Sequence, residues 1–447
     1  MHMAKQKVRY VCSACGASFG SWAGRCTSCG EWNTLSEQLD ISSATAAASG
    51  KKVELANIAT LAKAKPTERL RIGIGDIDEV LGGGIVPGSV VLIAGQPGIG
   101  KSTLLMQLSA AVASTKRVMY VSGEESQQQV ALRAARLGAS SKSLELASAT
   151  VANDIAATIA DEHADLVIID SIQTLCCNEI ASAAGSVSQI TSSTQLITAA
   201  AKKTNTALLI VGHVTKEGSI AGPKILEHMV DVVLQLEGDR YGGFKVLRAV
   251  KNRYGSTNEA SIFDMTDEGL KPVDNPSAAL LEERQVSDGS VVLATLEGTR
   301  PLLVEVQALV NTSNFGYPKR TASGFDLNRL NLLVAVLEKR TKLNLSDKDI
   351  FINIVGGIKL NDPAADLAVC MAIGSASKGL QLKTDAVVYG EVGLSGEVRH
   401  VGHADKRLSE AKKLGFELAI GPRLKGKKNA FLHEVRDVRD ALNTFLK

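Results

Sequence analysis

Residues 95–103 read GQPGIGKST, from Gly95 to Thr103, and this stretch decides the fold of the chain around it. It matches G-x-x-x-x-G-K-S, the pattern of a P-loop. The apolar run VVLIA at 90–94 precedes it, and the run LLMQL at 104–108 continues it as a helix. This order of strand, glycine loop and helix predicts a nucleoside triphosphate site in an α/β fold.

The residue types of this loop suit phosphate binding. Its glycines let the backbone bend tightly and bring N–H groups close to phosphate oxygens. The helix that begins near Lys101 directs the positive end of its dipole at the same anion. The Lys101 ammonium can reach the β- and γ-phosphates of ATP, and the Ser102 hydroxyl can coordinate Mg²⁺. The predicted nucleotide-binding residues of the loop are Gly95, Gly98, Gly100, Lys101, Ser102 and Thr103.

A pair of acidic residues follows the next apolar strand. The run RVMYV at 117–121 leads into SGEES at 122–126. A carboxylate at the carboxyl end of a strand beside the P-loop strand can face the γ-phosphate and polarise the attacking water. We predict this general-base role for Glu124, with Glu125 as the alternative. A solvated acidic turn is the plainer interpretation of the pair.

Two further strand ends carry candidate site residues. The apolar run at 165–170, DLVIID, ends in Asp170 and is typical of a Walker B strand, so Asp170 is predicted to hold Mg²⁺ through water. The run ALLIVG at 207–212 ends at His213, which could sense the γ-phosphate and signal to the following loop. An ordinary hydrogen-bonded residue at a strand end is an equally good interpretation of His213.

Strands and helices alternate through this part of the chain. Two more strands are expected near 232–236 and 245–250, and the second leads into KNRYG at 251–255. The alternation predicts a mostly parallel sheet with helices on both faces. Ligands of such sheets bind at the carboxyl ends of the strands.

The N-terminal segment carries a pattern of cysteines typical of a zinc site. Cys12 and Cys15 form one C-x₂-C pair, and Cys26 and Cys29 form a second pair ten residues later. Four thiolates at this spacing can close a tetrahedron around a structural Zn²⁺, although a redox dithiol has similar spacing. We expect the chain's two tryptophans, Trp22 and Trp32, to cover this small module. The module itself has too little core to fold without metal.

Composition narrows the class of protein. The chain has 447 residues, 45% apolar and 22% charged, which is ordinary for a globular protein of two to four domains. Its net charge of +3 gives no global attraction to nucleic acid, and 4% aromatics leave few platforms for base stacking. The sequence has no apolar run long enough to cross a membrane as a helix. The start, MHMAKQKVRY, lacks the apolar core of a signal peptide. We therefore expect a cytoplasmic protein outside any membrane.

The motifs together resemble those of a known family. The ATPase part resembles the RecA-type core, and the whole chain from about Cys12 resembles the bacterial RadA (Sms) DNA repair proteins. The segments that carry the resemblance are GQPGIGKST, SGEES, IIDSIQTL, HVTKEGSIAGPK and KNRYG. The resemblance implies a hexameric ATPase, similar to DnaB helicases, that binds single-stranded DNA. It also implies branch migration of recombination intermediates, hence branched DNA, alongside the RecA recombinase.

The resemblance also assigns roles to basic residues. The K-x-R spacing of Lys251 and Arg253 resembles the pair that DnaB-type motors insert into the ATP site of the neighbouring subunit. An arginine delivered in this way would stabilise charge in the transition state, although a basic strand end can simply bind water or phosphate. DNA-facing loops of RecA-type proteins correspond to 176–190 and 214–225. Lys216 and Lys224 of the second loop are the predicted phosphate contacts.

The C-terminal part resembles the proteolytic domain of Lon proteases, which use a serine and a lysine. Ala364 stands at the position of the serine, Asp405 aligns with the lysine, and Lys406 lies one place away. A methyl group cannot attack a carbonyl. The predicted division is a C4 zinc ribbon at 1–35, a linker at 36–67, a RecA-like ATPase at 68–270 and a non-proteolytic Lon-like α+β domain at 271–447.

These inferences predict a DNA-dependent ATPase, a helicase-type motor for homologous recombination and repair. Two alternatives stay open. The first is an ATP-dependent Lon-like protease, which the order of domains suggests and the missing serine opposes. The second is a nucleotide-switched protein that loads a partner on DNA without translocating.

Overall fold

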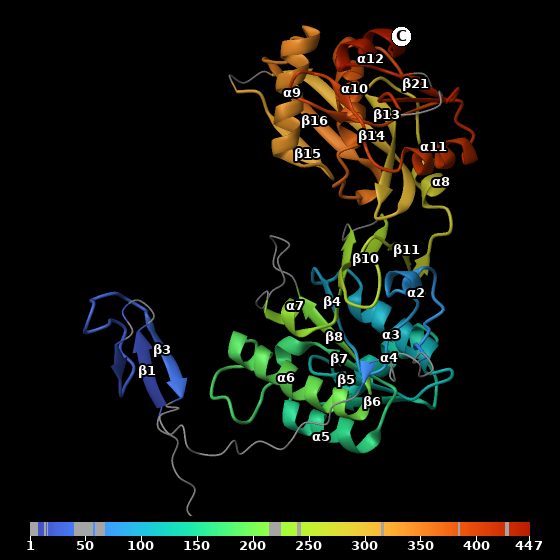
Figure 1. The fold of residues 1–447 in the computed structure, drawn as a ribbon. Coiled ribbons are helices and arrows are strands. Elements are labelled where there is room, and N and C mark those ends of the chain that lie inside the picture. Colours follow the sequence, from blue (N-terminus) through green and yellow to red (C-terminus); the bar gives the residue numbers. More distant parts are fainter. Residues whose placement is uncertain are drawn as a thin grey trace, which may run out of the picture. The chain divides into compact units, whose positions relative to one another are not determined.

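A computed structural model describes most of the chain (Figure 1). The described residues are 8–12, 15, 17–39, 57–58, 68–213, 225–238, 243–313, 317–382, 385–424 and 429–447. Contacts divide the chain into two units, Met1–Pro66 and Thr67–Lys447, and each is treated by itself. No helix of the described residues is long and apolar enough to cross a membrane.

The ATPase part is built on one large sheet. In the described chain, nine strands follow the order β12-β11-β10-β9-β4-β8-β7-β5-β6. The strands from β9 to β6 pair in parallel, and β10, β11 and β12 continue the sheet antiparallel. The expectation of a mostly parallel sheet is confirmed. The bounds are β4 Val90–Gly95, β5 Val118–Ser122, β6 Leu144–Ser148, β7 Leu166–Asp170, β8 Ala207–His213, β9 Val232–Gly238, β10 Lys245–Asn252, β11 Ala260–Thr266 and β12 Gly269–Pro272.

Helices cover both faces of this sheet, and the strand sequences explain why. Every residue of β4 is buried, as expected for a parallel strand packed on both sides. Its alternate side chains enter two separate cores: Val91 and Ile93 join one, whereas Val90 and Leu92 join the other. The helices are α2 Ile77–Val80, α3 Lys101–Val112, α4 Gln127–Arg136, α5 Ala152–Glu162, α6 Val187–Thr204 and α7 Ile225–Met229 (Figure 1).

The C-terminal part has its own mixed sheet. Within the described residues, seven strands follow the order β15-β16-β14-β13-β17-β20-β21. The strands are β13 Ser290–Glu297, β14 Arg300–Thr312, β15 Arg320–Ser323, β16 Lys348–Ile354, β17 Ala386–Val388, β20 Leu418–Gly421 and β21 Leu432–Glu434, and a separate hairpin is formed by β18 Glu391–Val392 and β19 Val398–Arg399. The helices are α8 Pro276–Leu281, α9 Leu327–Thr341, α10 Ala365–Lys378, α11 Ala404–Lys413 and α12 Val438–Phe445.

The apolar patterns of α9 and α10 account for how deeply each helix is buried. The apolar positions of α9 recur on one face, and Leu330, Leu333, Val334 and Leu337 are buried. Helix α10 is buried along almost its whole length, from Ala365 to Ser375. A helix that is apolar all round belongs in a core, and α10 packs against β13 and β14.

Charged contacts join the ATPase sheet to the C-terminal sheet. Arg248 of β10 lies 3.0 Å from Glu237 of β9 and 3.1 Å from Glu297 at the end of β13. Burial raises the pKa of Glu297, and the Arg248 charge opposes that rise. Arg300, which begins β14, pairs with Asp76 before α2. Residues 67–447 therefore form a single compact unit.

An ion pair occupies the region that corresponds to a Lon active site. Ala364 is fully buried before α10, and its neighbour Asp362 lies 2.6 Å from Arg407 of α11. Asp362 also accepts hydrogen bonds from the Thr295 hydroxyl and from backbone amides. Lys406 is turned elsewhere and donates to the Thr299 carbonyl at 3.1 Å. This network holds the segment before α10 against β13.

Arg407→Ala should destabilise the C-terminal sheet by about 3–5 kcal/mol, because it leaves the Asp362 carboxylate buried without its partner. Hydrogen exchange of peptides from α10 and α11 measures the loss locally. Lys406→Ala, an exposed change on the same helix, should cost less than about 0.5 kcal/mol. Equal exchange in both variants would contradict the importance of this pair.

Candidate nucleotide site and zinc centre

The loop between β4 and α3 has the backbone that a P-loop needs. Gly98 and Gly100 have φ angles of +79° and +109°, in the left-handed region that favours glycine. Gly100 is the N-cap of α3 and, as a glycine, has no side chain that could cap the helix. The free N–H groups of the first turn therefore point into the loop, where an anion can accept them.

Lys101 lies beneath the loop in a buried position. Its ammonium donates to the carbonyls of Gly95 at 2.9 Å and Gln96 at 3.0 Å. Burial lowers the pKa of Lys101 to about 8, and the charges of Asp170 and Glu124 partly oppose this shift. The site therefore holds a cation that is short of compensating negative charge. A bound phosphate would supply that charge and raise the pKa again.

The predicted acids meet at the carboxyl ends of neighbouring strands. Ser122 at the end of β5 pairs with Asp170 at the end of β7, and the Gly123 amide donates to the Asp170 carbonyl at 2.9 Å. Glu124 follows directly and accepts a hydrogen bond of 2.5 Å from the Ser171 hydroxyl. Glu124 and Asp170 therefore face the same region as Lys101.

The structure separates Glu124 from its alternative. Glu125 forms an ion pair with Arg133 of α4, so its carboxylate is held on the side of that helix. Glu124 instead contributes to the charge at Lys101. Of the two acids, Glu124 is therefore the one whose charge acts on Lys101, and its role as general base stays a prediction.

Sequence reasoning missed the residues that hold the two acids in place. The Tyr120 hydroxyl donates to Asp170 at 2.6 Å, in a buried contact between β5 and β7. Ser171 holds Glu124 in the same way. Both residues lie in segments that the motifs had already marked, but only the strand register shows which side chains meet.

Three predicted residues have no described side chain. His213 ends β8, between the P-loop strand and the strand of Asp170, and its backbone pairs with Gly95. Lys216 and Lys224 lie outside the described residues, as does most of the loop that carries them. Their roles stay predictions.

The P-loop lies at the side of the sheet where the parallel strands end. Lys251 and Arg253 lie at the opposite side, where those strands begin. Strand β10 runs antiparallel to β9, so Asn252 pairs with Val232, whereas Gly95 pairs with Leu236. The four steps along the strand from Val232 to Leu236 span roughly 13 Å. Neither basic side chain can therefore join Glu124 and Asp170 within its own subunit.

Both basic residues are anchored at that edge. The Lys251 ammonium donates to the carbonyls of Glu227 and Val230, at 2.5 Å and 2.8 Å, at the end of α7. Burial and the neighbouring Arg253 charge lower the pKa of Lys251. Arg253 lies 3.0 Å from Asp231, and 55% of its side chain is exposed. Its guanidinium is thus held in place and still accessible from outside.

The turn after Arg253 packs tightly on the start of the domain. A side chain on Gly82 would meet the Gly255 Cα at 2.9 Å, so the two glycines permit a close backbone contact. Arg69 adds hydrogen bonds to the carbonyls of Gly82 and Tyr254, at 2.6 Å and 3.0 Å. The KNRYG segment is therefore fixed by residues far away in sequence.

A pocket of about 470 Å³ lies beside the P-loop helix. Thr103 and Arg136 line one side, and the β11–β12 hairpin lines the other with Met265, Thr266, Asp267 and Gly269. Gln107 of α3 fixes the hairpin through two hydrogen bonds to the backbone of Leu270. Because the pocket lies beside Thr103 of the P-loop, it leaves space there for a group larger than the phosphates.

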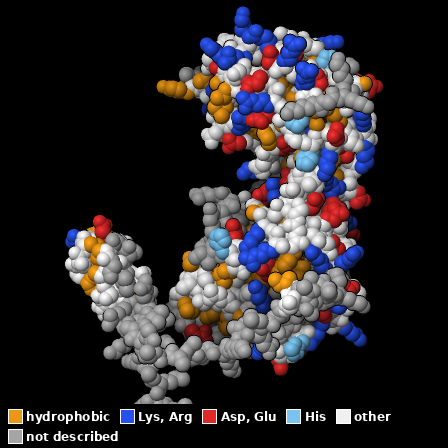
Figure 2. Space-filling model, in the orientation of Figure 1, with side chains coloured by type: hydrophobic (Ala, Val, Ile, Leu, Met, Phe, Trp, Pro, Cys, Tyr) orange, Lys and Arg blue, Asp and Glu red, His pale blue; other side chains and the backbone are white. Residues whose placement is uncertain are grey.

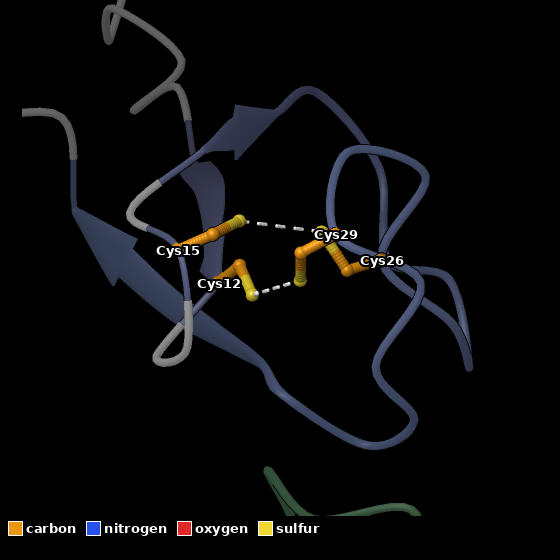
Figure 3. A group of neighbouring side chains, drawn as sticks. All are labelled: Cys12, Cys15, Cys26 and Cys29. Atoms are coloured by element: carbon orange, nitrogen blue, oxygen red, sulfur yellow. Dashed lines mark hydrogen bonds between the residues drawn. The ribbon is translucent and has the colours of Figure 1, made fainter.

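The N-terminal unit gathers its four predicted cysteines (Figure 3). Their sulfurs all lie within 4.8 Å of one another, and Cys12–Cys29 and Cys15–Cys26 are separated by 3.7 Å. A tetrahedral Zn²⁺ with Zn–S bonds of about 2.3 Å requires sulfurs about 3.8 Å apart. The four thiols therefore fit a structural zinc ion. The surrounding sheet has the order β2-β1-β3, with β1 Val8–Cys12, β2 Ser18–Phe19 and β3 Leu35–Leu39.

The expectation that the tryptophans cover this module is wrong. Trp22 is 60% exposed and Trp32 is 68% exposed. Cys12, Cys26 and Leu35 form the small core instead, with Tyr10, Phe19 and Ala23 packed against it. When a metal ion joins the two C-x₂-C pairs, the fold does not need the indole rings to form its core.

These features define the class of protein: a P-loop ATPase with a zinc ribbon and a Lon-like C-terminal fold. Family models agree with each part. An AAA domain matches residues 76–219, a rubredoxin metal binding domain matches 10–37, and the subunit ChlI of Mg-chelatase matches 331–424.

Curated relatives identify the family. The chain is 48% identical to the DNA repair protein RadA of Aquifex aeolicus over 94% of both chains, and 49% identical to that of Pseudomonas aeruginosa over 94% of both chains. It is 47% identical to RadA of Bacillus subtilis over 94% of this chain and 93% of the relative. The chain belongs to the RadA family of DNA repair proteins.

Removal of zinc should unfold the N-terminal ribbon and leave Thr67–Lys447 folded, since the two units are separate in contacts and only the first lacks a sizeable core. Chelation during hydrogen exchange measures both regions at once. Cys26→Ser should reproduce the effect, whereas Cys370→Ser, outside the cluster, should leave the zinc content unchanged. A ribbon that stays protected without metal would refute the structural role of zinc.

Proposed function

We propose that this protein is a DNA-dependent ATPase that moves on single-stranded DNA as a ring, hexameric by resemblance to the family. It would promote branch migration of recombination intermediates, including branched DNA, together with RecA. The observation that carries the proposal is that the P-loop lies where the parallel strands end, whereas Arg253 lies where they begin. Lys251 and Arg253 cannot reach the P-loop of the same chain, and the exposed Arg253 side chain is accessible to a second copy of the chain.

Each group at the P-loop edge has a role in this proposal. Lys101 and the backbone of the loop bind the phosphates, with Ser102 and Asp170 as holders of Mg²⁺, which would neutralise charge on the β- and γ-phosphates. Glu124 accepts a proton from the attacking water. Tyr120 keeps Asp170 in position from below. The pocket beside Thr103 and Arg136 receives the base and ribose.

The neighbouring subunit completes the site. Arg253 would leave Asp231 and approach the γ-phosphate of the next subunit, where its charge stabilises the transition state. Lys251 stays close to α7, whose start follows the loop of Lys216 and Lys224. We infer that His213, whose backbone pairs with Gly95 at the same side of the sheet as the P-loop, reports the state of the γ-phosphate to this loop. DNA bound there through lysines would be held without regard to sequence.

The alternatives are less well supported. A protease would need a nucleophile where Ala364 is buried, and the adjacent carboxylate is occupied by Arg407. The C-terminal half is therefore proposed as a scaffold for ring assembly. A loader that only switches between nucleotide states would have no use for Glu124 near the phosphates and an exposed arginine at the opposite edge.

Single-stranded DNA should stimulate ATP hydrolysis, because the DNA-facing loop follows the strand end at His213. Steady-state hydrolysis with and without oligonucleotide measures this, with sizing of the assembly in parallel. Lys101→Ala should abolish the activity, and Lys116→Ala, an exposed lysine beyond α3, should not change it. If DNA does not change the rate of ATP hydrolysis and the protein cleaves casein, the proposal is wrong and the protease alternative is favoured.

Arg253→Ala and Glu124→Gln should each lower DNA-stimulated hydrolysis by at least roughly 100-fold. Mixed rings can be prepared by giving each variant its own tag and purifying through both tags. About a quarter of their sites should be active, namely those where the intact Glu124 of one subunit meets the intact Arg253 of its neighbour across a heterologous interface. Arg71→Ala, an exposed arginine elsewhere in the domain, serves as control. Mixed rings as inactive as either variant alone would place Arg253 outside the neighbour's site.

A further inference from the structure

The exposed face of the zinc ribbon carries both tryptophans of the chain. Trp22 and Trp32 are more than half exposed, and Figure 2 shows apolar side chains on the surface of the N-terminal unit. Large exposed aromatic groups on a small module indicate an interaction surface when the fold does not need them. The core of Cys12, Cys26 and Leu35 shows that this fold does not.

The two indole rings lie close together over one stretch of backbone. A Cβ atom on Gly24 would be 3.9 Å from the Trp22 ring and 3.9 Å from the Trp32 ring. Gly24 accepts a hydrogen bond of 2.9 Å from the Asn33 amide, and Arg25 pairs with Trp32 in a β-bridge. These backbone contacts hold Gly24 and Arg25, which lie between the two tryptophans in sequence, against the segment of Trp32 and Asn33.

Arg25 extends this surface. Its guanidinium lies 5.7 Å from the centre of the Trp32 ring, and its Nε donates to the Gly30 carbonyl at 2.7 Å. A cation over one face of an indole leaves the remaining ring surface available for a planar partner. Apart from the zinc-binding cysteines, Arg25 and Glu31 are the charged residues of 17–36, so this surface has no excess of positive charge.

The loops of the ATPase part that would face DNA lack aromatic side chains, which the ribbon surface has. The segments 176–190 and 214–225, which would face DNA in a ring, contain no Phe, Tyr or Trp. They can supply lysines for phosphates but no rings on which bases stack. Proteins that bind single strands combine both kinds of contact. In this chain the adjacent aromatic pair lies on the ribbon.

We propose that Trp22, Trp32 and Arg25 form a stacking site for the unpaired bases of single-stranded DNA. This inference rests on the proposed function, which brings single-stranded DNA to the same protein. An aromatic surface without an excess of positive charge gains little from phosphates, so it favours unpaired bases over a duplex, whose bases are already stacked. The ribbon would hold a strand that the ring engages elsewhere through lysines, and the linked sites would reinforce each other.

The chain allows a direct measurement, because all of its tryptophan fluorescence comes from this site. Selective excitation of tryptophan in the full-length, zinc-loaded protein is followed while single-stranded oligothymidylate is added. Saturable quenching is expected, and duplex DNA of the same length should produce far less. Quenching that is absent while the same DNA stimulates ATP hydrolysis overturns the proposal.

Variants separate stacking from other effects. Trp22→Ala and Trp32→Ala should each weaken single-strand affinity about ten-fold, by a similar factor at low and high salt. Tyr317→Ala, an aromatic that is 88% exposed in the C-terminal half, is the matched control and should leave affinity unchanged. Zinc content of each variant shows that the ribbon remains folded.

Two further outcomes decide between this proposal and others. If the tryptophan variants keep their DNA affinity and lose binding of a recombinase protein, the surface is a protein-docking site and the proposal is wrong. If DNA fails to stimulate hydrolysis but still quenches the tryptophans, the ribbon site stands and the proposed motor function fails.

Discussion

Burial of the central strands on both faces is the constraint on which the ATPase part depends. Strand β4 is buried at every residue, and its alternate side chains serve two cores, so the sheet interior has no room for polar groups. Along β4, β7 and β8, polar and charged residues are therefore confined to the strand ends. The parallel pairing then gathers Gly95, Ser122 and Asp170 along a single edge.

The change of direction between β9 and β10 has the opposite effect. An antiparallel strand ends where its parallel neighbours begin, so Lys251 and Arg253 are carried away from their own P-loop. Asp231 and the end of α7 hold them there, and the close contact of Gly82 with Gly255 fixes the turn that follows. One subunit thus presents a nucleotide-binding edge and, opposite to it, an exposed arginine. This polarity suits head-to-tail assembly, in which each site lies between two copies.

In the C-terminal half, a charged network holds the segment before α10 in place. Ala364 of this segment is fully buried. Asp362 and Arg407 join the segment to β13 through an ion pair and hydrogen bonds to the backbone. Contacts of Arg248 with Glu297 and of Arg300 with Asp76 then link this half to the ATPase sheet. The half is consequently part of the same compact unit as the ATPase sheet.

The sequence alone determined the P-loop, the acids at the strand ends and the four cysteines, because each is a local pattern whose spacing directly reflects the chemistry. It also determined the buried helix α10, whose unbroken apolar run has no place outside a core. Only the tertiary structure decided which side chains meet: Tyr120 with Asp170, Ser171 with Glu124, Arg407 with Asp362 and Arg253 with Asp231. It also turned Trp22 and Trp32 outward, against expectation from their size. The physical reason is the same in each case: register and burial depend on contacts between distant segments, which local spacing does not encode.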